Sequence, residues 1–77
     1  KTCQYIIDSY DERILEIKNN VVNKNSVVLI SISEYNGAAI PSVHIKEIKD
    51  DAFIVRIVNM SPNQKINGFL KINFIVH

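Results

Sequence analysis

The side chains able to act as a nucleophile or a general base are few and widely separated in this 77-residue chain. Cys3 is the one cysteine, and the two histidines are His44 and His77. Nucleophilic catalysis needs a base within hydrogen-bond reach of the attacking atom, and no local arrangement brings a Ser or Cys to either histidine. His44 lies on the polar side of an alternating run, where a solvated imidazole is the usual state. The chain is therefore not expected to be an enzyme.

Metal and disulfide chemistry finds equally little support in the sequence. A single cysteine cannot form an internal disulfide, and no Cys/His cluster has metal-ligand spacing. The acidic pairs Asp11-Glu12 and Asp50-Asp51 lack the further carboxylates and the glycine spacing of a calcium loop. Both pairs are interpreted as polar turns, and no metal or cofactor is expected.

The best candidate for surface recognition is the segment Tyr35-Asn36-Gly37. An Asn-Gly pair accepts positive φ at little cost and favours a tight reversal, which would lift its neighbours off the sheet. An aromatic ring beside an amide can hold a sugar through stacking and paired hydrogen bonds. Tyr35 and Asn36 are therefore predicted to bind a receptor or glycan. The alternative is a plain turn in which the Tyr35 ring packs against the domain.

The elements that must position these residues are β-strands. Fourteen Ile and eight Val stand against three Leu and three Ala, and Cβ-branched residues favour a pleated sheet. Strands are predicted at 26–33, 43–48, 52–58 and 69–76. The short polar segment 49–51 predicts an antiparallel hairpin between the second and third of these, and Asn67-Gly68 predicts a turn. Ile48 breaks the alternation of Val43 and Ile45, which indicates a bulge or a strand end.

The N-terminal segment has two interpretations. Ser9 and Glu12 have capping-box spacing, and apolar residues recur at helical spacing around them. The competing interpretation pairs strand 3–7 with strand 13–18 across the residues between them. Strands are favoured, because a lone helix would need a sheet face to cover, but the sequence leaves residues 8–20 open between helix and strand.

Charge and hydropathy exclude several classes of partner. A net charge of +1 disfavours nucleic-acid binding, which needs a surplus of Lys and Arg on one face. No apolar run approaches the ~18 residues of a membrane span, so membrane insertion is not expected. Residues 1–77 are interpreted as a single domain and, because the chain begins with Lys, as a cut or processed piece of a longer protein.

Several predicted strands are apolar on both faces. A small antiparallel β-sandwich of about six strands covers one face of each, because its second sheet packs there. Large apolar patches are rarely left exposed on monomers, so part of the other face is predicted to form an oligomer interface. The residues assigned to that interface are Ile30, Ile54, Phe69 and Ile75.

From Asn25 onward four segments follow one another in a fixed order. They are Asn25-Ser26-Val27-Val28-Leu29, Pro41-Ser42-Val43-His44-Ile45, Phe53-Ile54-Val55-Arg56-Ile57-Val58-Asn59 and Ile66-Asn67-Gly68-Phe69-Leu70, which continues to Val76. This order of features resembles the C-terminal head module of virion fibre and spike proteins, found in phages and large DNA viruses. The resemblance covers about 50 residues and rests on the order and spacing of these segments. Residues 1–12 have no counterpart in it.

The resemblance implies a homotrimeric β-sandwich at the tip of a fibre on the virion surface. Its expected role is assembly with copies of itself and a contribution to host attachment through a surface receptor or glycan. The alternative is a carbohydrate-binding β-sandwich from a non-viral secreted complex, although such a module would be expected to contain more Trp, and this chain has none.

Overall fold

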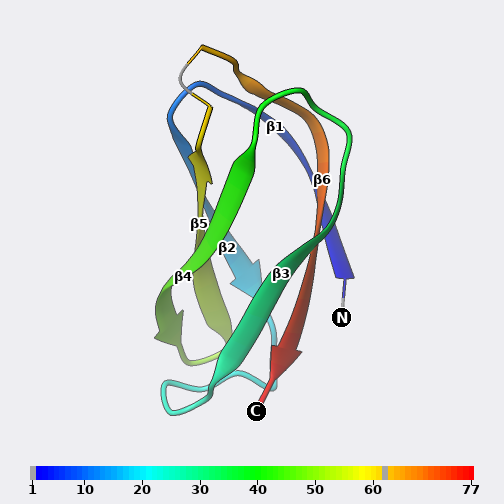
Figure 1. Ribbon diagram of the computed structural model, residues 1–77. Helices are drawn as coiled ribbons and strands as arrows, with labels where there is room; N and C mark the ends of the chain where they lie inside the picture. Colours follow the sequence, from blue (N-terminus) through cyan, green and yellow to red (C-terminus); the bar gives the residue numbers. More distant parts are fainter. Residues whose placement is uncertain (1, 62) are drawn as a thin grey trace.

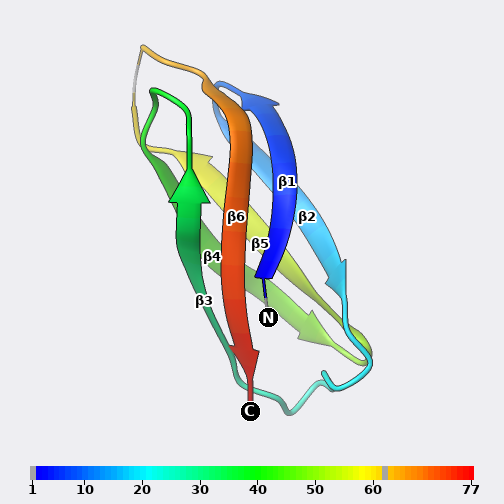
Figure 2. The same ribbon diagram turned by 90° about the vertical axis from the view of Figure 1, so that its right-hand side faces the viewer.

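The computed structural model describes residues 2–61 and 63–77, and it folds them into six β-strands without a helix (Figure 1). The strands are β1 (Thr2–Ser9), β2 (Glu12–Lys18), β3 (Val28–Tyr35), β4 (Pro41–Lys49), β5 (Ala52–Asn59) and β6 (Ile66–Val76). They form two three-stranded antiparallel sheets, which lie one behind the other as a small sandwich (Figure 2). The predicted all-β fold is confirmed.

The chain alternates between the two sheets. Sheet A has the order β1-β6-β3, and sheet B has the order β2-β5-β4. Among these six strands, β4 and β5 alone are consecutive in the sequence and paired in space, so their predicted hairpin is confirmed. Every other connection carries the chain from one sheet to the other.

The N-terminal segment is strand, as favoured, but its predicted pairing is wrong. β1 pairs with β6 and β2 pairs with β5, so these two strands lie in different sheets. The Ser9 hydroxyl donates a hydrogen bond to the backbone oxygen of Glu12 at 2.9 Å, which is not the N-cap geometry of a helix. The segment between β1 and β2 is therefore a short corner that joins the two sheets, and Ile7 and Ile17 are both buried in the interior. A hairpin within one sheet would not require both side chains to be buried.

The core consists of aliphatic and aromatic side chains from the inner faces of both sheets. Its strand residues are Ile7, Ile17, Val28, Phe53, Val55, Ile57, Ile66, Leu70, Ile72 and Phe74. Phe53 of sheet B and Phe74 of sheet A meet edge to face, with ring centroids 4.9 Å apart. Phe74 is 2% exposed and therefore lies in the core.

Two β-bulges change which side chains point inward. The first lies in β4 between Ile45 and Glu47, and it brings Ile48 back toward the core, as the broken alternation predicted. The second lies in β3 between Ile32 and Glu34, and it was not predicted. Because successive side chains alternate between faces, an extra residue reverses the phase of everything that follows it.

The β4–β5 turn and the β2–β3 connection are hydrogen-bonded to each other. Asp51 has φ 66° and donates its backbone N–H to the oxygen of Val22 at 2.8 Å. The Asp50 carboxylate accepts the backbone N–H of Lys24 at 3.0 Å. The interpretation of Asp50-Asp51 as a polar turn is confirmed, and its backbone and side chains are used to anchor the β2–β3 connection.

The turn predicted at Asn67-Gly68 is wrong, because β6 runs through it without a break. Gly68 has φ 104°, in the region that glycine tolerates. A Cβ atom at Gly68 would also collide with the side-chain amide of Asn36. The glycine is therefore needed for close approach of a neighbouring loop and not for a chain reversal.

Candidate interaction surfaces

The outer face of sheet A carries an exposed apolar patch at one end. Leu29 of β3 lies directly opposite Ile75 of β6, and Val27 follows on the same side, joined to His77 by two backbone hydrogen bonds. The exposed fractions of Val27, Leu29 and Ile75 are 56%, 54% and 52%. We call these three residues the Leu29 patch.

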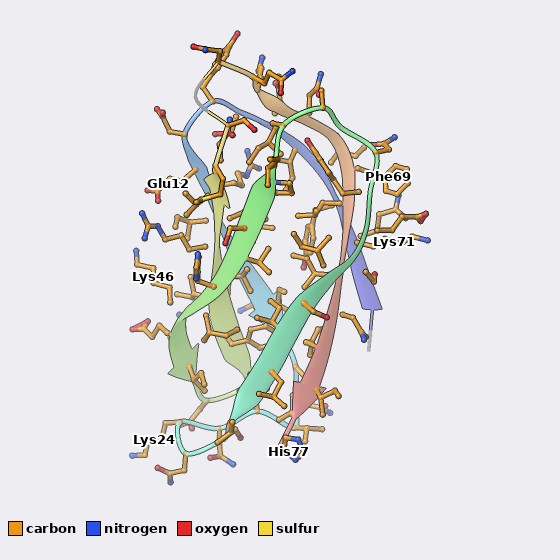
Figure 3. The ribbon with its side chains drawn as sticks, viewed as in Figure 1. Glu12, Lys24, Lys46, Phe69, Lys71 and His77 are labelled. Carbon is orange, nitrogen blue, oxygen red and sulfur yellow. The ribbon has the colours of Figure 1, made fainter. Side chains whose placement is uncertain are left out.

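The same face carries a second apolar pair at its other end. Ile6 of β1 lies opposite Phe69 of β6, and Ile6 is 83% exposed. Polar residues separate this pair from the Leu29 patch, among them Lys71, which is paired with Glu34 at 3.5 Å. Figure 3 shows Phe69 and Lys71 pointing away from the sandwich on this side, with Glu12 and Lys46 on the opposite side.

The structure divides the four predicted interface residues between three environments. Phe69 and Ile75 lie on the outer face of sheet A, as expected. Ile30 lies on the inner face and packs against the core, so its assignment to an outer interface is wrong. Ile54 lies on the outer face of sheet B between Glu16 and Glu47, and is half-buried. It therefore cannot belong to the same patch as Ile75.

The outer face of sheet B is a charged surface. Lys49 is 2.8 Å from one oxygen of Glu16, and Arg56 pairs with Glu12. The hydrogen bond from Lys49 lowers the pKa of Glu16 below its usual range, and the same bond raises the pKa of Lys49. These pairs place charges of both signs side by side, which makes this face a solvated surface of mixed charge.

A serine and a histidine meet on this charged face, so the expectation that no local arrangement brings a Ser to a histidine is wrong. The Ser42 hydroxyl and His44 Nε2 are 3.1 Å apart on neighbouring outward positions of β4. This is the distance of a nucleophile–base pair, but both groups lie on an open sheet surface. Arg56, and not a carboxylate that could orient the imidazole, lies directly opposite His44. The pair is better explained as a surface hydrogen bond.

The Tyr35 ring is turned toward the interior and not lifted off the sheet. It packs against the core, and its hydroxyl is buried without a hydrogen-bond partner among the described residues. The ring lies over Gly37, where an added Cβ would collide with it. The physical reason is the β3 bulge, which reverses the phase after Ile32 and places Tyr35 opposite the buried Leu70.

At the end of sheet A the side-chain oxygen of Asn36 accepts a hydrogen bond that a backbone carbonyl would otherwise accept. Its side-chain oxygen accepts the N–H of Phe69 at 2.9 Å, and its own N–H donates to the Phe69 oxygen at 3.4 Å. The carbonyl of the Asn36 amide is therefore already engaged within the domain. The predicted pairing of a free ring with a free amide is not present at Tyr35 and Asn36, although receptor binding by this loop remains a prediction.

The exposed aromatic at this end of the molecule is Tyr10, in the corner between β1 and β2. Its ring lies 5.5 Å from the ammonium of Lys65, which also pairs with Asp8 at 2.6 Å. The hydrogen bond to Asp8 raises the pKa of Lys65. Ile40 and Met60 lie at the same end, joined by a backbone hydrogen bond of 2.8 Å. The exposed fractions of Tyr10, Ile40 and Met60 are 66%, 64% and 61%.

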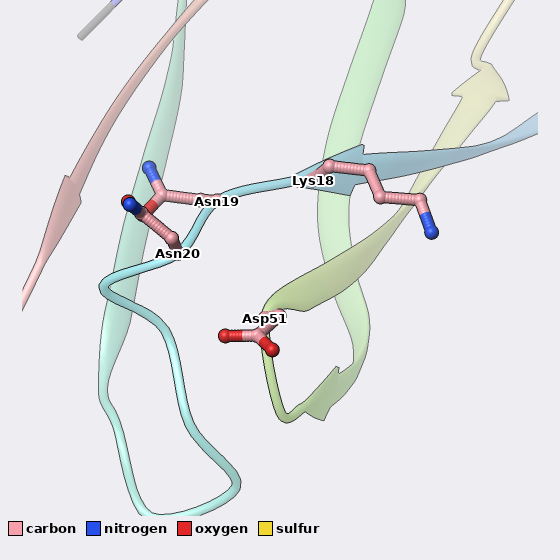
Figure 4. Close-up of a pocket in the computed structure, with 4 residues that line it drawn as sticks. All are labelled: Lys18, Asn19, Asn20 and Asp51. Carbon is pink, nitrogen blue, oxygen red and sulfur yellow. The ribbon is translucent and has the colours of Figure 1, made fainter.

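The opposite end of the sandwich carries a shallow, open pocket of about 440 Å³. Lys18, Asn19, Asn20 and Asp51 line it (Figure 4). The backbone N–H of Asn19 donates to the Asp51 oxygen at 2.9 Å, so the pocket floor is the junction that anchors the β4–β5 turn. Its side chains offer one ammonium, one carboxylate and two amides.

The described part of the chain offers neither a metal-binding cluster nor a membrane-spanning helix. Residues 2–61 and 63–77 hold no group of three or more His, Cys, Asp or Glu residues that could bind a metal ion. Within those residues there is also no helix of the length and apolarity needed to cross a membrane. The side chain of Cys3 lies outside the described part of the structure.

The Leu29 patch and Ile6 could not be identified from the sequence, and the reason is the same for both. Alternation along 26–33 puts Val27 and Leu29 on the face opposite Ile30, but alternation alone does not say which face meets the second sheet. Ile6 lies beside the buried Ile7, and which of the two points inward could be assigned only with the partner strand β6 known.

Comparisons with protein-family models, with curated proteins and with solved structures found no match to this chain.

Proposed function

We propose that this domain is the head module of a virion fibre or spike, where it assembles as a homotrimer and contributes to host attachment. The order and spacing of its sequence segments support the proposal, since they resemble fibre-tip modules. The two-sheet antiparallel fold is compatible with such a module. The observation that carries the proposal is the Leu29 patch.

Burial of the Leu29 patch supplies the driving force for assembly. Complete burial of a large aliphatic side chain is worth about 1.5–3 kcal/mol, and Val27, Leu29 and Ile75 are each about half exposed. Roughly 1 kcal/mol per side chain therefore remains to be gained. Around a three-fold axis three copies of the patch meet one another, so the gain is repeated in every subunit.

The test of assembly is sedimentation of the wild-type domain at micromolar concentration. The expected mass is about three times the chain mass of 8.8 kDa, or a multiple of that mass where trimers associate with one another. Ile75→Asp should convert the trimer into monomers, because it places a carboxylate in the shared patch. Ile40→Asp is the matched control, since Ile40 is also largely exposed but lies outside the patch. A wild-type domain that stays monomeric at every concentration contradicts the proposal, and so does an Ile75→Asp variant that remains a trimer.

Host attachment is assigned to the loop end that carries Tyr10, Ile40 and Met60. Loops commonly carry recognition, and tyrosine is enriched among the few interface residues whose truncation costs more than about 1 kcal/mol of binding. Tyr10→Ala should weaken adhesion to host cells while leaving the trimer intact, whereas the equally exposed control Val21→Ala should change neither. Glycan binding by a monomer would instead favour the carbohydrate-binding alternative.

A further inference from the structure

Each three-stranded sheet has two edges, and three of the four edge strands carry features that discourage pairing with another chain. β3 and β4 are interrupted by bulges, and β4 also begins with Pro41. β2 carries four charged residues in seven positions. Bulges, prolines and edge charges are the usual devices by which proteins prevent strand addition.

The β1 edge has none of these protections. Its pairing with β6 is continuous from Thr2 to Ser9 without a register shift. The strand contains no proline, and Asp8 is its one charged residue. It also presents Ile6, whose exposed fraction of 83% is the largest among the exposed large hydrophobic residues of the described chain.

The backbone of Ile6 is oriented toward this open edge. In an antiparallel ladder, residues directly opposite each other either exchange both hydrogen bonds or neither. Ile6 lies opposite Phe69, whose N–H and C=O are both bonded to Asn36 on the other side of β6. Ile6 therefore does not exchange hydrogen bonds with Phe69, and its own N–H and C=O point away from the sheet. The backbone N–H and C=O groups of Gln4 and Asp8, two residues before and after Ile6, point in the same direction.

We propose that β1 is an interface between two copies of this chain, which pair β1 with β1 in antiparallel fashion about a two-fold axis at Ile6. The backbone groups of Ile6 then bond to those of Ile6 in the second copy, and Gln4 lies opposite Asp8. The two sheets A become one continuous sheet.

Side-chain chemistry favours this register over its neighbours. A two-fold axis perpendicular to the sheet keeps the two faces distinct, so opposite residues must have the same phase. The register centred on Ile6 sets the amide of Gln4 against the carboxylate of Asp8, and it places no like charges opposite each other. It also brings together two Ile6–Phe69 pairs on the outer face, which gives four apolar side chains in one row. Shifting the centre to Tyr5 would set Ile6 against Gln4 and lose that row.

This contact goes beyond the proposed trimer, because a two-fold contact cannot be one of the contacts of a closed three-fold ring. It joins copies that belong to two different trimers. It uses the β1 edge at one end of sheet A, whereas the trimer uses the Leu29 patch at the other end. The two contacts can therefore be tested separately.

The experiment is cysteine cross-linking in a Cys3→Ser background, with oxidation to a disulfide and non-reducing gels. Ile6→Cys should form a covalent dimer, since directly paired Cα atoms lie about 5.5 Å apart and a disulfide spans about 4.4–6.8 Å. Gln4→Cys and Asp8→Cys should each remain uncrosslinked alone but form a dimer when mixed. Ile14→Cys, on an exposed position of the β2 edge, is the control and should stay uncrosslinked.

The results separate the inference from the proposed function. Cross-linking at Ile6 and between positions 4 and 8 supports the β1 contact, whatever the mass of the parent assembly. An uncrosslinked Ile6→Cys variant overturns it, and so does a cross-link of Gln4→Cys to Ile6→Cys in place of the expected pairs. Retention of the trimer mass in that case leaves the proposed function standing. Ile6→Lys supplies a second readout: it should abolish association of trimers in pairs, and unchanged pairing would also overturn the inference.

Discussion

Removal of one oxygen atom, in Tyr35→Phe, should make the domain more stable. The Tyr35 hydroxyl is buried and has no hydrogen-bond partner among the described residues, while the ring itself packs against the core. A buried polar group left without a partner costs about 1–3 kcal/mol. Because the tyrosine as a whole is only half-buried, the lower end of that range applies, and the expected gain is about 1 kcal/mol.

The assay is urea and thermal unfolding of the wild-type domain, Tyr35→Phe and Tyr35→Ala side by side. With a urea slope of about 1 kcal/mol/M, the phenylalanine variant should unfold at a midpoint about 1 M higher. Its Tm should rise by about 4–8 °C. Tyr35→Ala removes the ring as well, and it should cost about 2 kcal/mol, roughly half the loss for a fully buried aromatic.

The opposite sign would refute the reasoning. If Tyr35→Phe lowers stability by 1 kcal/mol or more, the hydroxyl makes a hydrogen bond that holds the loop. If Tyr35→Ala leaves the unfolding free energy unchanged, the ring is not part of the core and is available for recognition after all. Adhesion measured on the same variants decides whether Tyr35 also contributes to attachment.

Two further predictions concern the core and the charged face. Phe74→Ala should cost about 3–5 kcal/mol in urea unfolding, because Phe74 is buried against Phe53; a loss below about 1 kcal/mol would contradict the assigned packing. The pKa of Glu16 is lowered by the hydrogen bond from Lys49, so its stabilising effect is present above the usual value of 4.5 and is lost as the pH falls through the lowered pKa. Unfolding midpoints from neutral pH down to about pH 3 should therefore fall more steeply for the wild type than for Lys49→Met, and parallel curves would contradict this.

The sequence was sufficient for the class of fold and for most of the inner faces. Phe53, Val55 and Ile57 alternate in a run of β-branched and aromatic residues, and this periodicity alone identified a half-buried strand. The β4 bulge was also visible, because Ile48 falls out of phase with Ile45. Such signals are local, so they survive without knowledge of the partner strand.

The strand pairing and the direction of the Tyr35 side chain could not be inferred from local sequence patterns. β1 was paired with its neighbour in the chain, but its partner β6 lies at the other end of the sequence. The bulge at residue 33 has no glycine or proline to mark it, and it alone reverses the direction of Tyr35. The choice between Ile30 and Leu29 as the outward residue needed the position of sheet B, which no pattern within 26–33 contains.

The central place of β6 in sheet A has a consequence for synthesis of the chain. β1 and β3 are not adjacent in the sheet, because each pairs with β6, which lies between them. β6 is also the strand that leaves the ribosome after the other five. Sheet A therefore cannot assemble during translation until residues 66–76 emerge, whereas the β4–β5 hairpin can form earlier. The nascent chain must keep the apolar β1 and β3 apart from other chains during that interval, so its folding should be slow and sensitive to crowding by sister copies.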